Sequence, residues 1–161
     1  MGVTGCGKST VGQSLAAALG AEFADADDFH PASNIAKMSA GAALTDEDRW
    51  PWLEDVGSWL ARHDQAVIAC SALKRSYRDL LRAAATGVVF VHLDAPQAVL
   101  EPRVRIRAER DGHFAPAGLL DSQFEALEPL GRDERGGEVD VETADANAAS
   151  RAALALVDRW R

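Results

Sequence analysis

The feature that most constrains this chain is a glycine-rich run near its amino end, Gly2-Val3-Thr4-Gly5-Cys6-Gly7-Lys8-Ser9, followed by Thr10. It fits the pattern G-x-x-x-x-G-K-[ST], a loop that leads into a helix and binds phosphate. Its glycines let backbone N–H groups approach an anion without a Cβ in the way, and the following helix adds the positive end of its dipole. We therefore predict a nucleoside-triphosphate site at residues 2–10. The competing interpretation is a glycine-rich turn with no ligand.

Two side chains of this run have predicted chemical roles. Lys8 can reach the β- and γ-phosphates, so we assign it to catalysis. The hydroxyl of Ser9 can ligate the Mg²⁺ that accompanies them. ATP and Mg²⁺ are accordingly the expected cofactors.

The composition restricts the partners that such a chain can have. Its 161 residues, 47% of them hydrophobic, suit one domain with a sizeable core. A net charge of −8 argues against a nucleic-acid surface. No run approaches the ~20 apolar residues of a membrane span, and no leader is evident. The two cysteines match neither a metal site nor a disulfide framework, so we expect reduced thiols and a cytoplasmic protein.

Short apolar runs alternate with segments of helical spacing along the chain. We expect strands at residues 22–24, 66–70 and 87–93, a weaker strand at 139–141, and helices at 9–19, 45–60, 74–85, 96–109 and 144–161. Thr45 and Asp48 resemble a capping box, and Pro102 should kink or end the fourth helix. The alternation predicts a three-layer α/β/α fold with a parallel sheet, in a single domain that spans residues 1–161.

A group of polar residues, Asp25-Ala26-Asp27-Asp28-Phe29-His30-Pro31, follows the first of these strands. Ligands of parallel sheets bind at the carboxyl ends of the strands, so these carboxylates should face the phosphate loop. Asp27 could accept the proton of an attacking hydroxyl, while Asp25 could hold Mg²⁺ through water. The competing interpretation is a solvated acidic turn that caps a helix at residues 34–38.

The rest of the sequence favours a small-metabolite kinase over other phosphate-loop proteins. It contains no N-K-x-D guanine-binding motif, and large ATPases need a longer chain. Four arginines, Arg103, Arg105, Arg107 and Arg110, suit a lid that brings cations onto the transferring phosphoryl group and excludes water. The competing interpretation is a solvated helix face.

Motifs in order along nearly the whole chain resemble the gluconokinase family. The matching segments are residues 2–9, Asp25-x-Asp27 with His30-Pro31, 34–38, 44–53, 70–82, Gly112-His113-Phe114, 122–128 and Asp133-Glu134. The resemblance implies a P-loop kinase fold related to shikimate and adenylate kinases, with strand order 2-3-1-4-5. It also implies ATP-dependent phosphorylation of D-gluconate at its 6-hydroxyl, and a homodimer.

The resemblance further implies roles for residues that would hold the acceptor. Arg49 is the first choice for the carboxylate of gluconate, because a guanidinium binds a carboxylate through two hydrogen bonds. Lys74 and Arg78 are further candidates for the acid or the transferring phosphate, and their competing interpretation is a solvent-facing basic helix. Asp27 would contact the 6-hydroxyl.

A lid at about residues 103–128 is the last expected part of the site. His113 and Gln123 could contact acceptor hydroxyls when it closes. Arg110 is assigned to catalysis as the arginine two residues before Gly-His-Phe, and Arg103 or Arg107 could supply a second cation.

The first strand of this fold, which lies at the centre of the sheet, has no counterpart here because only Met1 precedes the loop. We expect its neighbours to be left unpaired and an apolar groove to open between them. The natural protein would then start upstream of Met1, or the chain would fold poorly unless a partner strand repaired it.

Three other functions compete with a gluconokinase. One is a kinase of another small hydroxy acid, such as shikimate. A second is a nucleotide-binding protein that has lost catalysis, and a third is an inactive fragment.

Overall fold

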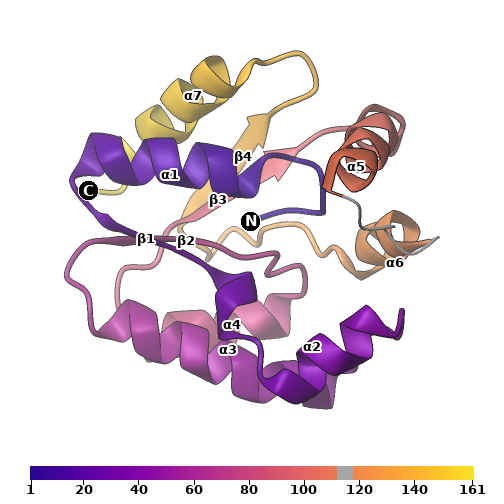
Figure 1. Cartoon of the computed structure of the whole chain (residues 1–161). Coiled ribbons are helices and arrows are strands. Elements are labelled where there is room, and N and C mark those ends of the chain that lie inside the picture. Colours follow the sequence, from indigo (N-terminus) through magenta and orange to yellow (C-terminus); the bar gives the residue numbers. More distant parts are fainter. Residues whose placement is uncertain (112–117) are drawn as a thin grey trace.

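The computed structural model describes residues 1–111 and 118–161. The helices are α1 (Lys8–Leu19), α2 (Ala32–Ser39), α3 (Asp46–Ala61), α4 (Arg75–Ala84), α5 (Gln97–Asp111), α6 (Leu119–Ala126) and α7 (Ala146–Asp158), with a 3-10 turn η1 (Ala26–Phe29). The strands are β1 (Glu22–Asp25), β2 (Ala66–Ala69), β3 (Phe90–Asp94) and β4 (Gly136–Asp140). Figure 1 shows three layers, with the strands between α1 and α7 on one face and α3 and α4 on the other. The predicted α/β/α fold class is confirmed.

The local signals in the sequence account for most element boundaries. The Thr45 hydroxyl accepts a hydrogen bond from Asp48 N at 3.3 Å, while a carboxylate oxygen of Asp48 accepts one from Thr45 N at 2.9 Å, which confirms the capping box at the start of α3. Of the kink or break expected at Pro102, the break is wrong, because α5 runs through this proline, and the kink stays a prediction. A predicted strand start at residue 87 is also wrong, since β3 begins at Phe90.

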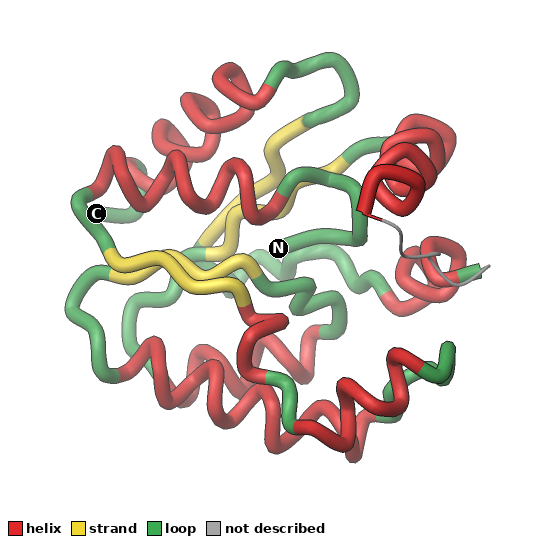
Figure 2. Tube along the Cα trace, in the orientation of Figure 1, coloured by secondary structure: helices red, strands yellow, loops and turns green. Residues whose placement is uncertain are grey.

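The sheet consists of two parallel pairs with the amino end of the chain between them. β1 pairs with β2, with Glu22 opposite Ala66, and β3 pairs with β4, with Phe90 opposite Gly136. Leu93 N donates to Met1 O at 2.9 Å, the Met1 amino group donates to Val91 O, and Gly2 N donates to Ser71 O at 3.1 Å. Figure 2 shows this segment as a loop between the two strand pairs. Met1 and Gly2 thus lie where the expected strand order places the central strand.

An apolar groove of about 490 Å³ lies between β2 and β3. It is lined by Leu15 of α1, Ile68 of β2 and Phe90 of β3, among others. The Met1 amino group at its end is buried, and the loss of water lowers the pKa of this group to about 6. The expected groove is therefore confirmed, while poor folding of the chain stays a prediction.

Two apolar clusters form the core, one on each side of the sheet. Leu100 of α5 and Ala153 of α7 are fully buried in the first, and Leu53 and Val56 of α3 in the second. Among the described residues, no helix is both long and apolar enough to span a membrane.

Candidate active site

The glycine-rich loop is shaped for an anion by its backbone. Gly5 and Gly7 have φ values of +82° and +92°, in the left-handed region that favours glycine. A Cβ on Gly5 would come within 2.8 Å of Val104 in α5, whereas a Cβ on Gly7 would meet nothing within 4 Å. α5 therefore packs closely behind one part of the loop, while the backbone at Gly7 faces open space. Lys8 begins α1, and its ammonium donates to Val3 O at 3.0 Å across the same loop.

The two residues predicted to hold a metal ion lie side by side where the loop enters α1. Ser9 of α1 donates its hydroxyl to a carboxylate oxygen of Asp25, the last residue of β1, at 2.6 Å. The other oxygen of Asp25 accepts from Asp27 N at 3.2 Å. A hydroxyl and a carboxylate are the hard oxygen ligands that Mg²⁺ prefers, so this pair fits the ion that accompanies ATP.

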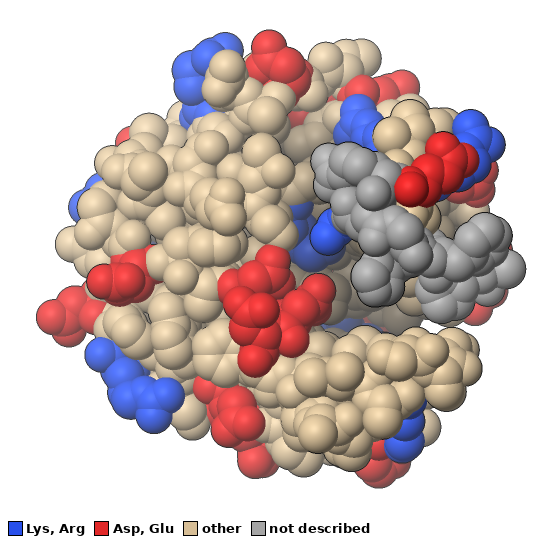
Figure 3. Space-filling view, in the orientation of Figure 1, with Lys and Arg blue, Asp and Glu red and all other residues tan. Residues whose placement is uncertain are grey.

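Asp27 is presented by the η1 turn at the carboxyl end of β1. The turn is held from behind by α3, because the indole N–H of the buried Trp52 donates to Ala26 O at 2.7 Å. The carboxylate of Asp27 itself is exposed. In the space-filling view, acidic side chains gather beside a hollow between the α2 side and the α5–α6 side of the molecule (Figure 3). An exposed carboxylate just after the carboxyl end of a parallel strand suits a group that contacts the acceptor.

A compact ion pair joins the start of α3 to the start of α4, in the region that we call the acceptor side because it carries the residues predicted to bind the acceptor. Lys74 donates to both oxygens of Asp46 at 2.7 and 2.8 Å, and the Tyr77 hydroxyl donates to one of them at 2.6 Å. These hydrogen bonds, that of Lys74 foremost, lower the pKa of Asp46, and the bond to Asp46 raises the pKa of Lys74. The half-buried Arg49 adds a smaller effect of the same sign on Asp46, which places its charge nearby. Binding of substrate by Lys74 and Arg49 stays a prediction.

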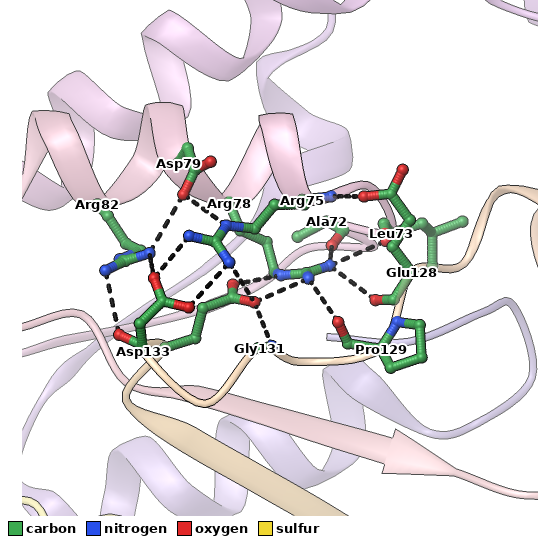
Figure 4. A network of polar contacts seen from close by, with 11 residues as sticks. Ala72, Leu73, Arg75, Arg78, Asp79, Arg82, Glu128, Pro129, Gly131 and Asp133 are labelled. Atoms are coloured by element: carbon green, nitrogen blue, oxygen red, sulfur yellow. Dashed lines mark hydrogen bonds and ion pairs between the residues drawn. The ribbon is translucent and has the colours of Figure 1, made fainter.

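Arg78 corrects one of the sequence-based assignments. Its side chain is fully buried, and its Nε and Nη2 donate to the two carboxylate oxygens of Glu134 at 2.6 and 3.0 Å. Its remaining donors bind carbonyl oxygens of Ala72, Leu73, Glu128 and Pro129. Figure 4 shows the guanidinium enclosed by these groups. Both predictions for Arg78, as a substrate ligand and as a solvent-facing residue, are wrong, because every donor is used inside the fold.

Glu134 completes this buried pair. Burial alone would raise the pKa of its carboxyl, but the hydrogen bonds from Arg78 and Gly131 N outweigh it, so the pKa is lowered and the group is ionised. The pair ties α4 to the segment at residues 128–134. That segment follows α6, so the pair also anchors the chain after α6 against α4.

The predicted lid residues are only partly described by the structure. Gln123 of α6 accepts a hydrogen bond from Thr4 N of the phosphate loop at 2.6 Å, so it lies against that loop. Its contact with an acceptor hydroxyl on lid closure stays a prediction. Arg103 donates to Val141 O and Glu142 O, both at 3.0 Å. The side chain of Arg110 and the whole of His113 lie outside the described residues, and closing of residues 103–128 stays a prediction.

Sequence reasoning missed several residues that support the site. The sequence indicates no role for Asp46 or Tyr77, although Tyr77 is the only tyrosine of the chain and lies one helical turn after Lys74. Asn34 was considered only as part of a motif, yet its buried amide donates to Asp48 O at 2.8 Å. The available signal was that all three residues lie inside segments that resemble the family. The sequence did not indicate which residues they would contact.

Comparisons with known proteins show which family this chain belongs to. A family model described as shikimate kinase matches residues 4–131. The thermosensitive gluconokinase of Escherichia coli is 48% identical over 139 residues, which cover 84% of this chain and 73% of that protein. This chain belongs to the gluconokinase family.

Two further comparisons agree with this family. The gluconokinase of Gluconobacter oxydans is 47% identical over 138 residues, covering 83% of this chain and 76% of that protein. The crystal structure of a gluconokinase from Sinorhizobium meliloti superposes with a TM-score of 0.88 at 47% identity, over 99% of this chain and 89% of that one. The gluconokinase family therefore accounts for both the sequence and the fold, and the P-loop kinase architecture expected from the motifs is confirmed.

Proposed function

We propose that this chain is an ATP-dependent gluconokinase that phosphorylates D-gluconate at its 6-hydroxyl, giving 6-phospho-D-gluconate and ADP. The observation that carries the proposal is the 48% identity to a gluconokinase over 84% of the chain. The geometry supports it, since the phosphate loop with Ser9 and Asp25 lies beside the turn that carries Asp27. We further propose a cytoplasmic enzyme with Mg²⁺ as its metal and a homodimeric assembly.

In this proposal the chain supplies positioning and charge to an in-line transfer. The loop amides and Lys8 bind the β- and γ-phosphates, where charge develops in a loose transition state. Mg²⁺, when bound at Ser9 and Asp25, would neutralise part of the phosphate charge. The oxygen of the 6-hydroxyl bonds to the γ-phosphorus while the bond from that phosphorus to the ADP oxygen breaks. Asp27 accepts the proton that this hydroxyl loses.

Arg49 holds the opposite end of the acceptor. The guanidinium pairs with the gluconate carboxylate and orients the chain so that its 6-hydroxyl reaches Asp27. Positioning contributes more than basicity to phosphoryl transfer, so a misplaced acceptor lowers the rate even when the base is intact.

The test is ADP release with ATP, Mg²⁺ and D-gluconate, compared with shikimate and with no acceptor. We expect gluconate-dependent turnover that falls at least about 100-fold in Asp27→Asn. Asp28→Asn changes the exposed neighbouring carboxylate and is the matched control, expected to keep most activity. A folded chain with no turnover of gluconate contradicts the proposal.

Shikimate is the second acceptor to examine, because the family model that matches residues 4–131 is described as shikimate kinase. Turnover of shikimate in place of gluconate would assign the chain to that reaction. ATP binding without turnover of either acid would favour a nucleotide-binding protein.

A further inference from the structure

His30 lies in the acceptor side of the site but has no role in the proposal so far. Its imidazole stacks on the indole of Trp52, with ring centroids 4.4 Å apart and planes inclined by 16°. The same indole donates to Ala26 O in the turn that presents Asp27. The ring of His30 is therefore fixed against the group that holds Asp27 in place.

The other contact of His30 fixes which ring nitrogen carries the proton. The amide nitrogen of Asn34 lies 3.4 Å from Nδ1 of His30 and also donates to Asp48 O at 2.8 Å. A carbonyl oxygen only accepts, so the group of Asn34 that meets both partners is its NH₂. Asn34 is 2% exposed, which holds this orientation. Nδ1 thus accepts, and the neutral imidazole carries its hydrogen on Nε2.

His30 lies near both charged groups that the proposed function assigns to the ends of the acceptor. Its backbone N–H donates to Asp27 O at 3.4 Å at the end of η1. Burial lowers the pKa of His30, the carboxylate of Asp27 opposes this shift, and the guanidinium of Arg49 adds to it. The ring is therefore neutral at neutral pH and close to both charges. His30 is half-buried, so part of the residue is accessible to solvent.

We propose that the Nε2–H of His30 donates a hydrogen bond to a hydroxyl in the middle of the gluconate chain, between Asp27 and Arg49. This makes His30 a substrate-binding residue that selects a polyhydroxy acid of the right length. The inference rests on the proposed function and adds the residue that recognises the polyol itself.

The first test is His30→Phe, which keeps a flat ring against Trp52 and removes the donor. We expect KM for D-gluconate to rise roughly 3- to 10-fold, the usual effect of one neutral hydrogen bond, with KM for ATP and the melting temperature nearly unchanged. The matched control is His63→Phe, because His63 also packs on a tryptophan, Trp59, with ring centroids 4.3 Å apart, at the far end of α3. His63→Phe should leave KM for gluconate unchanged.

The second test identifies the hydroxyl. Gluconates that lack the hydroxyl at carbon 2, 3, 4 or 5 are compared in the wild-type chain and in His30→Phe. With the wild-type chain, one analogue should have a lower kcat/KM than gluconate. His30→Phe should not lower the kcat/KM for that analogue any further, because both changes remove the same hydrogen bond. His30→Gln, which retains an N–H donor, should recover part of the discrimination, and it replaces His30→Phe if that variant does not fold.

The outcomes separate this inference from the proposed function. No turnover of gluconate by the wild-type chain overturns the proposed function and the role of His30 with it. Wild-type turnover with an unchanged KM for gluconate in His30→Phe overturns the role of His30 alone. A parallel loss of melting temperature and of affinity for ATP shows that His30 only supports the fold.

Discussion

The nucleotide side and the acceptor side of the site are built in different ways. On the nucleotide side, the groups proposed to bind phosphate come from one continuous stretch, residues 2–9, and its shape depends on glycines and on the start of α1. On the acceptor side, the groups come from η1, α2, α3, α4 and the segment at residues 128–134, which are joined by side-chain hydrogen bonds. A substitution should therefore affect chemistry on the first side and folding as well as binding on the second.

The largest effect should come from the buried pair behind the acceptor side. Arg78→Ala leaves Glu134 charged and unpaired in the interior, so we expect a loss of about 3–5 kcal/mol in the free energy of unfolding, measured with urea. Arg82→Ala removes an arginine of the same helix that pairs with the exposed Asp133 and should cost under about 1 kcal/mol. A stable Arg78→Ala whose only defect is a raised KM for gluconate would restore Arg78 as a substrate ligand and remove the contrast.

The next effect isolates the nucleotide side. Lys8→Ala should lower kcat by roughly 100- to 1,000-fold, because a cation aimed at the developing charge is lost. The melting temperature should stay within a few degrees, since among the described residues the Lys8 ammonium donates one hydrogen bond, to Val3 O in its own loop. Lys37→Ala, which removes an exposed lysine paired with Asp48 on α3, is the control for a lost surface charge and should keep near-normal kcat. A Lys8→Ala variant that unfolds would show that the loop is not independent of the fold.

The smallest effect should come from the exposed pair of Arg75 and Asp133, which lies beside the buried Arg78–Glu134 pair. Hydrogen bonds from Arg75 lower the pKa of Asp133 to about 2, below its ordinary value of 3.8. The unfolded chain therefore binds the proton more readily between about pH 4 and pH 2, so this stabilisation is present above pH 4 and is lost as the pH falls toward 2. Asp133→Asn should flatten the acid limb of the stability curve, measured by thermal melting at each pH.

Two controls accompany this pH measurement. Asp64→Asn, an exposed carboxylate outside the network, should leave the slope as it is in the wild type. Added salt should shrink the effect of Asp133→Asn, because both partners are solvent-exposed. An unchanged slope in Asp133→Asn would show that the acid dependence arises from the buried half of the network.

The predicted residues that the structure brings together have partners that are near in the chain or fixed by topology. Ser9 and Asp25 are 16 residues apart, but a helix after the loop and a strand ending at the same edge bring them together in any fold of this class. The two partners of the capping box, Thr45 and Asp48, are only three positions apart in the sequence. The prediction for Arg78 was wrong because its partner, Glu134, is 56 residues away in the sequence. A helical arginine has the same local sequence pattern whether it is buried or solvated.

The sequence by itself determined the phosphate loop, the alternation of strands and helices and the family, since each depends on contiguous residues or on motifs in order along the chain. Only the tertiary structure decided how the acceptor side is held. It showed that Lys74 is paired with Asp46, that Gln123 contacts Thr4, and that His30 is held between Trp52 and Asn34. The physical reason is that a hydrogen bond depends on distance and direction in space, whereas the sequence records only separation along the chain.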